Sequence, residues 1–134
     1  MLKQLSIYAE NKKGALQAMT NALYEAGINI WGSVTNDGAE YGINRMVVSD
    51  PDKAKEVLTE NGYLCRFVDV LAVEIEDKPG ALNTLLSALL DSNVNVDYTY
   101  LSFNRDSSTP VMILHTADPE EVEICLKAKG FKMV

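Results

Sequence analysis

Two short stretches of the sequence combine polar residues, a glycine and a leucine at the same spacing: residues 11–16 read NKKGAL and residues 77–82 read DKPGAL. Gly14 and Gly80 leave the backbone without a side chain where a leucine-rich run begins. If that run is helical, its N-terminus carries partial positive charge and unpaired N–H groups, which can bind a carboxylate. Turns before helices favour the same residue types for conformational reasons alone, so a plain turn is the alternative.

A second polar position recurs between aliphatic residues. Asn29 stands in the segment INI and Asn95 in VNV. An asparagine amide can accept a hydrogen bond from an amino group and donate one to a carboxylate, or it can simply close a turn. Trp31 follows closely and could line a pocket, a core or an interface. We expect both asparagines to face the same site as the glycine turns.

Residues that would support catalysis or metal binding are scattered. Cys65 and Cys125 lie 60 residues apart without a CxxC motif, and His115 is the single histidine, so we expect neither a metal site nor a disulfide. The sequence has no phosphate-binding loop, no serine elbow and no paired nucleophile and base. Arg45 and Arg105 are candidate carboxylate partners by charge alone. We therefore expect no cofactor and no enzymatic activity.

Composition and charge restrict the class of protein and its partners. The chain has 134 residues, of which 47% are hydrophobic and 23% charged, as in ordinary soluble globular domains. The net charge of -7 argues against nucleic acid, because phosphate binding needs a basic surface. We find neither a signal peptide nor an apolar run of membrane-spanning length, and we expect a cytoplasmic protein.

The sequence contains an internal repeat. An offset of 66 aligns residues 11–30 with residues 77–96, and further along the offset becomes 68, which aligns residues 50–51 with residues 118–119. We expect the two extra residues in a polar hairpin of the second copy, because a loop absorbs an insertion easily. The identical pairs of the first segment are Lys12/Lys78, Gly14/Gly80, Ala15/Ala81, Leu16/Leu82, Ala22/Ala88, Leu23/Leu89 and Asn29/Asn95.

Each half of the chain reads as strand, helix, strand, strand, helix, strand. Alternating apolar residues mark the strands, a leucine stripe marks the first helix, and an Asp-Pro start with a Gly stop marks the second helix. In the first half we expect these elements near residues 5–7, 16–26, 27–35, 41–48, 50–62 and 63–68. In the second half we expect them near residues 71–75, 82–90, 93–103, 110–116, 118–130 and 131–134.

This order of elements is the split βαβ arrangement, which predicts an α+β fold. Two ferredoxin-like βαββαβ units would each form an antiparallel sheet with both helices on one face, over residues 1–68 and 69–134. The segment that joins the halves contains no Gly, Pro or Ser, so we expect the last strand of one unit to run almost directly into the first strand of the next. We expect the two units to be joined side by side.

At this point the residues resemble the ACT domain, a small-molecule sensing module attached to many enzymes of amino-acid metabolism. Residues 77–82 match the pattern Asp-x-Pro-Gly-x-Leu after the first strand, and an Asn between aliphatic residues precedes the second strand in both halves. The resemblance covers both halves, and the chain looks like a stand-alone tandem ACT protein. It implies that an amino acid binds where the first loop of one ACT unit faces a neighbouring unit.

The resemblance also implies the binding residues. They share a position in the first loop, at the helix entrance or at the start of the second strand: Asn11, Gly14, Ala15, Leu16, Asn29, Ile30, Asp77, Gly80, Ala81, Leu82, Asn95 and Val96. The first copy departs from the family pattern, because Asn11 and Lys13 stand where Asp and Pro are usual. Whether one copy or both copies bind is left open, as is the amino acid.

The resemblance further implies a non-catalytic regulatory protein that modulates a partner enzyme or transporter of amino-acid metabolism, in the form of a homodimer. One alternative is a scaffold for protein interaction and oligomerisation that keeps the fold and has lost the ligand. Another is the regulatory subunit of a biosynthetic enzyme such as acetolactate synthase. A ferredoxin-like RNA binder is disfavoured, because the surface charge has the wrong sign and no RNP-like aromatic run is present.

Overall fold

A computed structural model describes residues 1–36 and 41–134. The chain divides into two compact units, which are considered separately: a first unit, Lys3–Val68, and a second unit, Asp69–Val134, which also includes Met1–Leu2. Among the described residues, no helix combines the length and the apolar character that crossing a membrane requires.

The first unit follows the predicted order of elements. It consists of β1 (Leu2–Glu10), α1 (Ala15–Glu25), β2 (Ile30–Asn36), β3 (Tyr41–Val48), α2 (Pro51–Glu60) and the start of β4 (Leu64–Glu74). Its strands lie in the order β2-β3-β1-β4. The strand pairs β1–β3 and β2–β3 are antiparallel, with Leu5 opposite Met46 in the first pair and Ser33 opposite Met46 in the second.

The second unit repeats this plan. It contains the remainder of β4, then α3 (Ala81–Asp91), β5 (Tyr98–Phe103), β6 (Pro110–His115), α4 (Pro119–Ala128) and β7 (Lys132–Met133). Here β4 pairs with both β6 and β7, and β5 pairs with β6, all antiparallel. The resulting order β7-β4-β6-β5 is equivalent to the order of the first unit.

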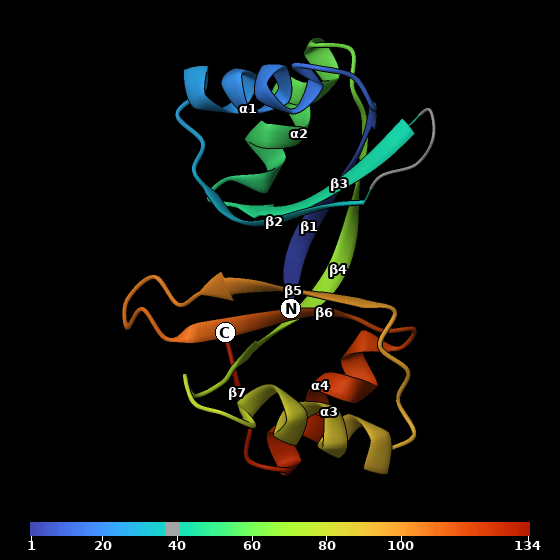
Figure 1. The fold of residues 1–134 in the computed structure, drawn as a ribbon, viewed down its shortest axis with the longest axis vertical. Coiled ribbons are helices and arrows are strands. Elements are labelled where there is room, and N and C mark those ends of the chain that lie inside the picture. The colour runs from blue at the N-terminus through green and yellow to red at the C-terminus, as the bar shows by residue number, and fades with distance from the viewer. Residues whose placement is uncertain (37–40) are drawn as a thin grey trace. The chain divides into compact units, whose positions relative to one another are not determined.

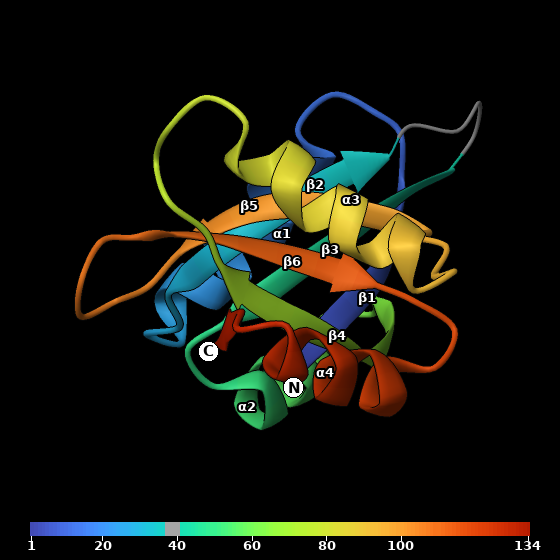
Figure 2. The same cartoon turned by 90° about the horizontal axis from the view of Figure 1, so that it is seen from below.

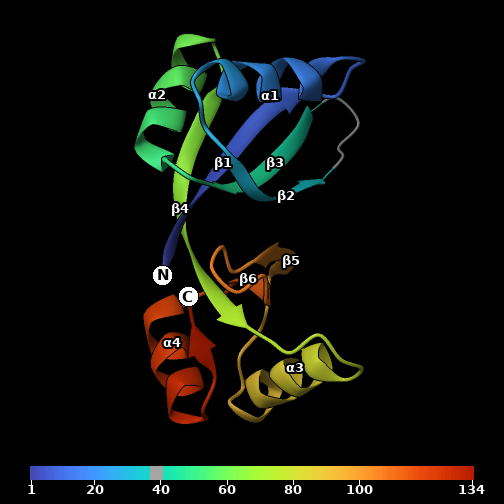
Figure 3. The same ribbon diagram turned by 90° about the vertical axis from the view of Figure 1, so that its left-hand side faces the viewer.

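These topologies confirm the predicted fold class of two ferredoxin-like units. In the first unit α1 and α2 cover the same face of the strands (Figures 1 and 3). In the second unit α3 and α4 likewise share one face, which can be followed again in Figure 2. Both helices of a unit bury their apolar side against the sheet, as amphipathic helices must.

Two details differ from the sequence predictions, and a third prediction is not tested. The two strands expected around the junction form one continuous strand, β4, because no residue that favours a turn interrupts residues 64–74. In the second unit β5 begins at Tyr98, several residues after Asn95, whereas in the first unit β2 begins directly after Asn29. The two residues gained by the second copy were predicted in a hairpin whose first-unit counterpart, residues 37–40, lies outside the described residues.

Each unit has its own apolar core, built from equivalent positions. Strand and helix residues of the first unit, among them Leu5, Ile7, Met19, Leu23 and Leu58, form one buried cluster. The second unit repeats it with Leu71, Val73, Leu85, Leu89 and Leu126.

The predicted leucine stripe of the first helix in each unit is buried only along its centre. Met19 and Leu23 are buried, whereas Leu16 is 48% exposed and Leu90 is 77% exposed. A straight helix meets a sheet along a narrow line, so the residues at the margins of the stripe stay in contact with solvent.

Candidate functional site

The two glycine turns adopt the same backbone conformation. Gly14 is the N-cap of α1 with φ 83°, and Gly80 is the N-cap of α3 with φ 86°. Both lie in the left-handed region, which glycine enters without the steric cost that a Cβ imposes. A Cβ built at either glycine would meet no atom within 4 Å, so the requirement for glycine is conformational and the space outside each turn is open.

At both entrances the N-cap residue is a glycine, which has no side chain to make a capping hydrogen bond. Asp77 is not the N-cap of α3, because Gly80 occupies that position and Asp77 lies three residues before it. The first-turn N–H groups of a helix have no partner within the helix. The N–H groups of Ala15 and Ala81, the first residues of the two helices, donate to the carbonyl oxygens of Lys12 and Lys78. The next N–H groups of each first turn carry partial positive charge and can bind an anion.

A pocket lies beside each helix entrance, and the two pockets are equivalent. Each is formed by the end of the first strand, the entrance of the following helix and the turn after the second helix of the unit. The first-unit pocket, of about 620 Å³, is lined by Tyr8, Ala9, Glu10, Lys12, Lys13, Gly14, Ala15, Ala18, Asn61, Gly62, Tyr63 and Leu64. The second-unit pocket, of about 370 Å³, is lined by Glu74, Ile75, Glu76, Lys78, Ala81, Thr84, Thr109, Gly130, Phe131 and Lys132.

Charges of both signs border these two pockets. The Nζ atom of Lys12 lies 3.0 Å from Glu10 Oε2, and Lys78 Nζ lies 2.6 Å from the equivalent Glu76 Oε2. These lysines and glutamates are mostly exposed, so each pair exchanges partners with solvent at little cost. A free amino acid carries an ammonium and a carboxylate group, and the mixed charge of the pocket rim complements both.

The first unit has a further pocket on the other side of the same loop. Its volume is about 280 Å³, and its lining includes the predicted binding residues Asn11, Ala15 and Leu16. Asn44 also lines it, is 2% exposed, and donates from Nδ2 to Thr35 Oγ1 over 2.7 Å. A buried amide held in this way is oriented by its partner, and we count it as a functional candidate.

Sequence reasoning did not identify Asn44 and Thr35. A usable signal was present, because the repeat aligns these polar residues with the apolar Met112 and Leu101 of the second copy. Asn44 and Met112 are buried, and a polar residue that replaces an apolar one at a core position of a repeat requires an explanation, whereas Thr35 and Leu101 are exposed.

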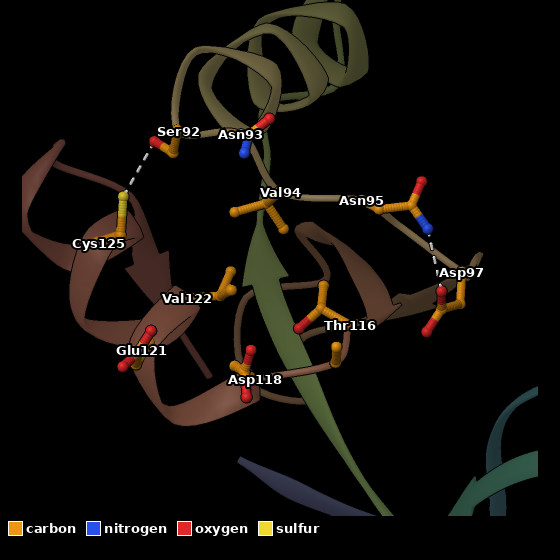
Figure 4. A pocket seen from close by; sticks show the side chains of 11 residues that line it. Ser92, Asn93, Val94, Asn95, Asp97, Thr116, Asp118, Glu121, Val122 and Cys125 are labelled. Carbon is orange, nitrogen blue, oxygen red and sulfur yellow. Dashed lines mark hydrogen bonds between the residues drawn. The ribbon is translucent and has the colours of Figure 1, made fainter.

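The structure does not bring the predicted asparagines to the glycine turns within a unit. Asn29 and Ile30 line a groove at the far end of α1, and an eleven-residue helix is about 16 Å long. The backbone N–H of Asn29 donates to Ser49 Oγ over 3.0 Å, and Asn29 accepts from the backbone N–H of Ser49. Asn95 lines another pocket at the equivalent end of the second unit (Figure 4).

The remaining predicted binding residues are divided between surface and core. Ile30 and Val96 are half-buried and pack against the cores of their units. Asp77, Gly80 and Leu82 are exposed and are not part of the lining of the second-unit entrance pocket, whereas Ala81 is. A site that combines a glycine turn with an asparagine from a second ACT unit stays a prediction.

The possible metal ligands and thiols among the residues that the structure describes are the acidic side chains, the two cysteines and His115. No group of three or more His, Cys, Asp or Glu side chains is placed to hold a metal ion within residues 1–36 and 41–134. Cys65 and Cys125 are free thiols. His115 contacts Asp97 Oδ2 through Nδ1 over 2.8 Å and stacks on Tyr98 with the ring centroids 4.9 Å apart.

Comparison with known proteins supports the resemblance seen in the sequence. The family model described as "ACT domain pair" matches residues 1–133. The solved structure of protein BT0572 from Bacteroides thetaiotaomicron is 32% identical, with a TM-score of 0.91, over 99% of this chain and 91% of that one. A search of curated proteins gave no significant match.

Two further solved structures share the fold at lower identity. The regulatory subunit of aspartate kinase from Thermus thermophilus is 17% identical with a TM-score of 0.67, over 94% of this chain and 88% of that one. The regulatory subunit of aspartate kinase from Thermus flavus is 19% identical with a TM-score of 0.61, over 96% and 91% of the two chains.

Proposed function

The chain belongs to the family of ACT domain pairs, and we propose that it is a non-catalytic regulatory protein that binds a free amino acid. In this proposal residues 1–68 and 69–134 are the two ACT domains, and two chains associate as a homodimer. The binding event changes the activity of a partner enzyme or transporter of amino-acid metabolism by favouring one of two states of the assembly.

One observation carries the proposal: an uncapped helix entrance on a left-handed glycine, open to solvent beside a pocket with mixed charge, occurs twice at equivalent positions. A conformational role explains the glycines, because φ is positive. It does not by itself explain why both entrances lack a capping side chain, since Ser, Thr, Asp or Asn at that position would stabilise the helix. A ligand carboxylate on the N–H groups of the first turn that have no partner within the helix would supply that stabilisation.

The similarity to the regulatory subunits of aspartate kinase supports the regulatory class. Those proteins share the paired fold with this chain. The proposed ligand residues are those that the resemblance implies at the loops, with Asn44 and Thr35 added in the first unit. Apolar surface from Leu16 at one loop and Leu82 at the other would accept an aliphatic or aromatic side chain.

The first test is a thermal-shift screen of the full chain against the twenty amino acids. An amino acid at a hundredfold excess over its Kd should stabilise the folded protein by about 2.7 kcal/mol. A folded protein that responds to none of the twenty would contradict the proposal.

The second test locates the site. Gly14→Val and Gly80→Val place a branched side chain in the open space at each entrance, and we expect the entrance that binds to lose the ligand-induced shift. Gly27→Val is the matched control, because Gly27 also has a positive φ of 73° with no atom within 4 Å of a built Cβ. The control should lose stability and keep the shift. If it loses the shift as well, the effect reflects backbone strain and the entrances are not the site.

A further inference from the structure

The second unit contains a pocket at the opposite end from its glycine turn, with a volume of about 400 Å³. It lies between the segment that follows α3 and the start of α4 (Figure 4). Its volume is within the range of small-molecule sites. The lining consists of Ser92, Asn93, Val94, Asn95, Asp97, Thr116, Ala117, Asp118, Glu121, Val122 and Cys125.

The charge of this pocket has one sign. Asp97, Asp118 and Glu121 supply carboxylates, and none of the lining residues, all of which the structure describes, is Lys or Arg. Asp118 is the N-cap of α4, yet it makes no capping hydrogen bond with the described residues of the helix. The Nδ2 group of Asn95 donates to Asp97 Oδ1 over 3.1 Å, which orients both side chains (Figure 4).

A buried hydroxyl of the pocket has no hydrogen-bond partner among the described residues. Thr116 is 2% exposed, and its Oγ1 atom makes no hydrogen bond with the described residues. Figure 4 shows this oxygen pointing into the ring of lining residues, on the side of Asp118 and Val122. Leaving a buried hydroxyl without a partner costs about 1–3 kcal/mol. A ligand group in the pocket would remove that cost.

The first unit shows what fills the equivalent space there. Position 121 of the second unit aligns with Lys53, the third residue of α2. The Nζ group of Lys53 donates over 2.9 Å to the carbonyl oxygen of Ala26, the C-cap of α1. The buried Thr116 is replaced by the buried Val48. The first unit thus carries its own ammonium group at this place, and the hydroxyl of Ser49, which aligns with Ala117, already accepts a hydrogen bond from the backbone N–H of Asn29.

We infer that the pocket formed by Asp97, Thr116, Asp118 and Glu121 is a binding site for a small organic cation with a primary ammonium group. Such a group has three N–H donors and would interact with several acceptors at once. In this assignment the ligand supplies to the second unit the ammonium that Lys53 supplies to the first. The carboxylates do not form a metal-binding group among the described residues, which favours an organic cation over a metal ion.

This site is separate from the glycine entrances and does not rest on the proposed function. Gly80 and its loop do not line it. A protein that failed to bind any amino acid at its entrances could still bind an amine here, and the converse also holds.

The test uses the full chain and n-butylammonium, followed by backbone amide shifts in NMR titrations. We expect saturable shifts confined to residues 92–97 and 116–122. n-Butanol has the same apolar chain without the charge, and tetramethylammonium has the charge without N–H donors, so neither should give these shifts. Equal responses to all three compounds, or shifts scattered over the acidic surface, would overturn the assignment.

Two variants sharpen the test, and the first has a reference variant. Glu121→Lys copies the first unit, and we expect it to weaken binding by about tenfold or more, because an added ammonium occupies the site and a charged acceptor is lost. Glu120→Lys makes the same charge change on an exposed neighbour outside the pocket and should change Kd by less than about twofold, as expected for a screened surface charge. Equal losses in both variants would show that net charge alone attracts the amine.

Thr116→Val is the second variant and removes the hydroxyl while keeping the shape of the first unit. We expect it to raise Kd for n-butylammonium several-fold, since one hydrogen bond to a charged group is lost. The variant should unfold no more easily than the parent protein. Unchanged binding in Thr116→Val, with weakened binding in Glu121→Lys, would show that Thr116 is not part of the site and would contradict the assignment.

Discussion

The two units, Lys3–Val68 and Asp69–Val134, share their strand order, their core positions and their glycine turns, and they differ in their polar residues. Leu23 and Leu89 are both buried, and Gly14 and Gly80 have nearly the same φ. By contrast, Lys53 aligns with Glu121, and Val48 aligns with Thr116. Apolar packing and backbone conformation define the fold, so they repeat, whereas polar side chains are free to define two different sites.

Substitutions in the two cores should have the largest effect on the free energy of unfolding. Leu23→Ala and Leu89→Ala should each lower the free energy of unfolding by about 2–5 kcal/mol, because each leaves a cavity in a packed core. Urea denaturation followed by circular dichroism measures the loss. Leu90→Ala is the control at 77% exposure and should stay within about 0.5 kcal/mol of the parent protein. A large loss in one unit and a negligible loss in the other would show that the cores are not equivalent.

Exchanging the residues at positions 48 and 116 should have the next largest effect on the free energy of unfolding. Val48→Thr places a hydroxyl in the buried position of the first unit and should cost about 1–3 kcal/mol, whereas the reverse change Thr116→Val should gain about 1 kcal/mol in the absence of ligand. Urea denaturation of both variants measures the two changes. If both substitutions are neutral, the hydroxyl of Thr116 has a partner in solution and the two positions are alike.

The glycine turns give a smaller effect that should be equal in the two units. Gly14→Ala and Gly80→Ala should each cost about 1–2 kcal/mol, the cost of a left-handed conformation for a residue with a Cβ. Asparagine at the same positions should cost less, since Asn93 already adopts a φ of 57° in this protein. Thermal unfolding of the four variants measures the series. An asparagine variant as unstable as the alanine variant would indicate lost space rather than backbone strain.

Substitutions at the N-cap of the second helix should have the smallest effect on the free energy of unfolding, and here the two units should differ. Asp50 Oδ1 accepts a hydrogen bond from the backbone N–H of Lys53 over 3.1 Å, while Asp118 makes no capping bond among the described residues. Asp50→Ala should cost about 1 kcal/mol. Asp118→Ala should cost about 0.5 kcal/mol or less, because it loses the helix-dipole contribution alone. Equal losses, measured by urea denaturation, would contradict this difference.

Much of the fold could be predicted from the sequence because the repeat presents every local signal twice. The period of two around Leu71 and Val73 indicated a strand, and the Asp-Pro start with a Gly stop indicated the second helix of each unit, as observed. The leucine stripe was predicted less well. The periodicity that placed Leu16 and Leu90 on the same helix face as buried residues does not give the width of the contact with the sheet, and both are exposed.

Less of the candidate sites could be predicted. The sequence identified Gly14 and Gly80 as helix entrances, because glycine followed by a leucine-rich run is a local pattern. It suggested that Asn29 and Asn95 lie near them, yet the length of α1 and α3 separates each asparagine from the entrance of its own unit. Asn44 and Thr116 were not identified, although the repeat aligns each of them with an apolar residue. Their burial and their partners depend on strands and helices that are distant in the sequence.

The sequence by itself determined the repeat, the order of elements, the family and the positions where the backbone needs glycine. These features depend on neighbouring residues and on spacing along the chain. Only the tertiary structure decided that the ammonium group of Lys53 lies in one unit at a place that carboxylates line in the other. It also decided that the hydroxyl of Thr116 is buried there with no partner in the part of the chain that the structure describes. Burial and hydrogen bonding depend on which segments pack together, and the order of residues along the chain does not specify these contacts.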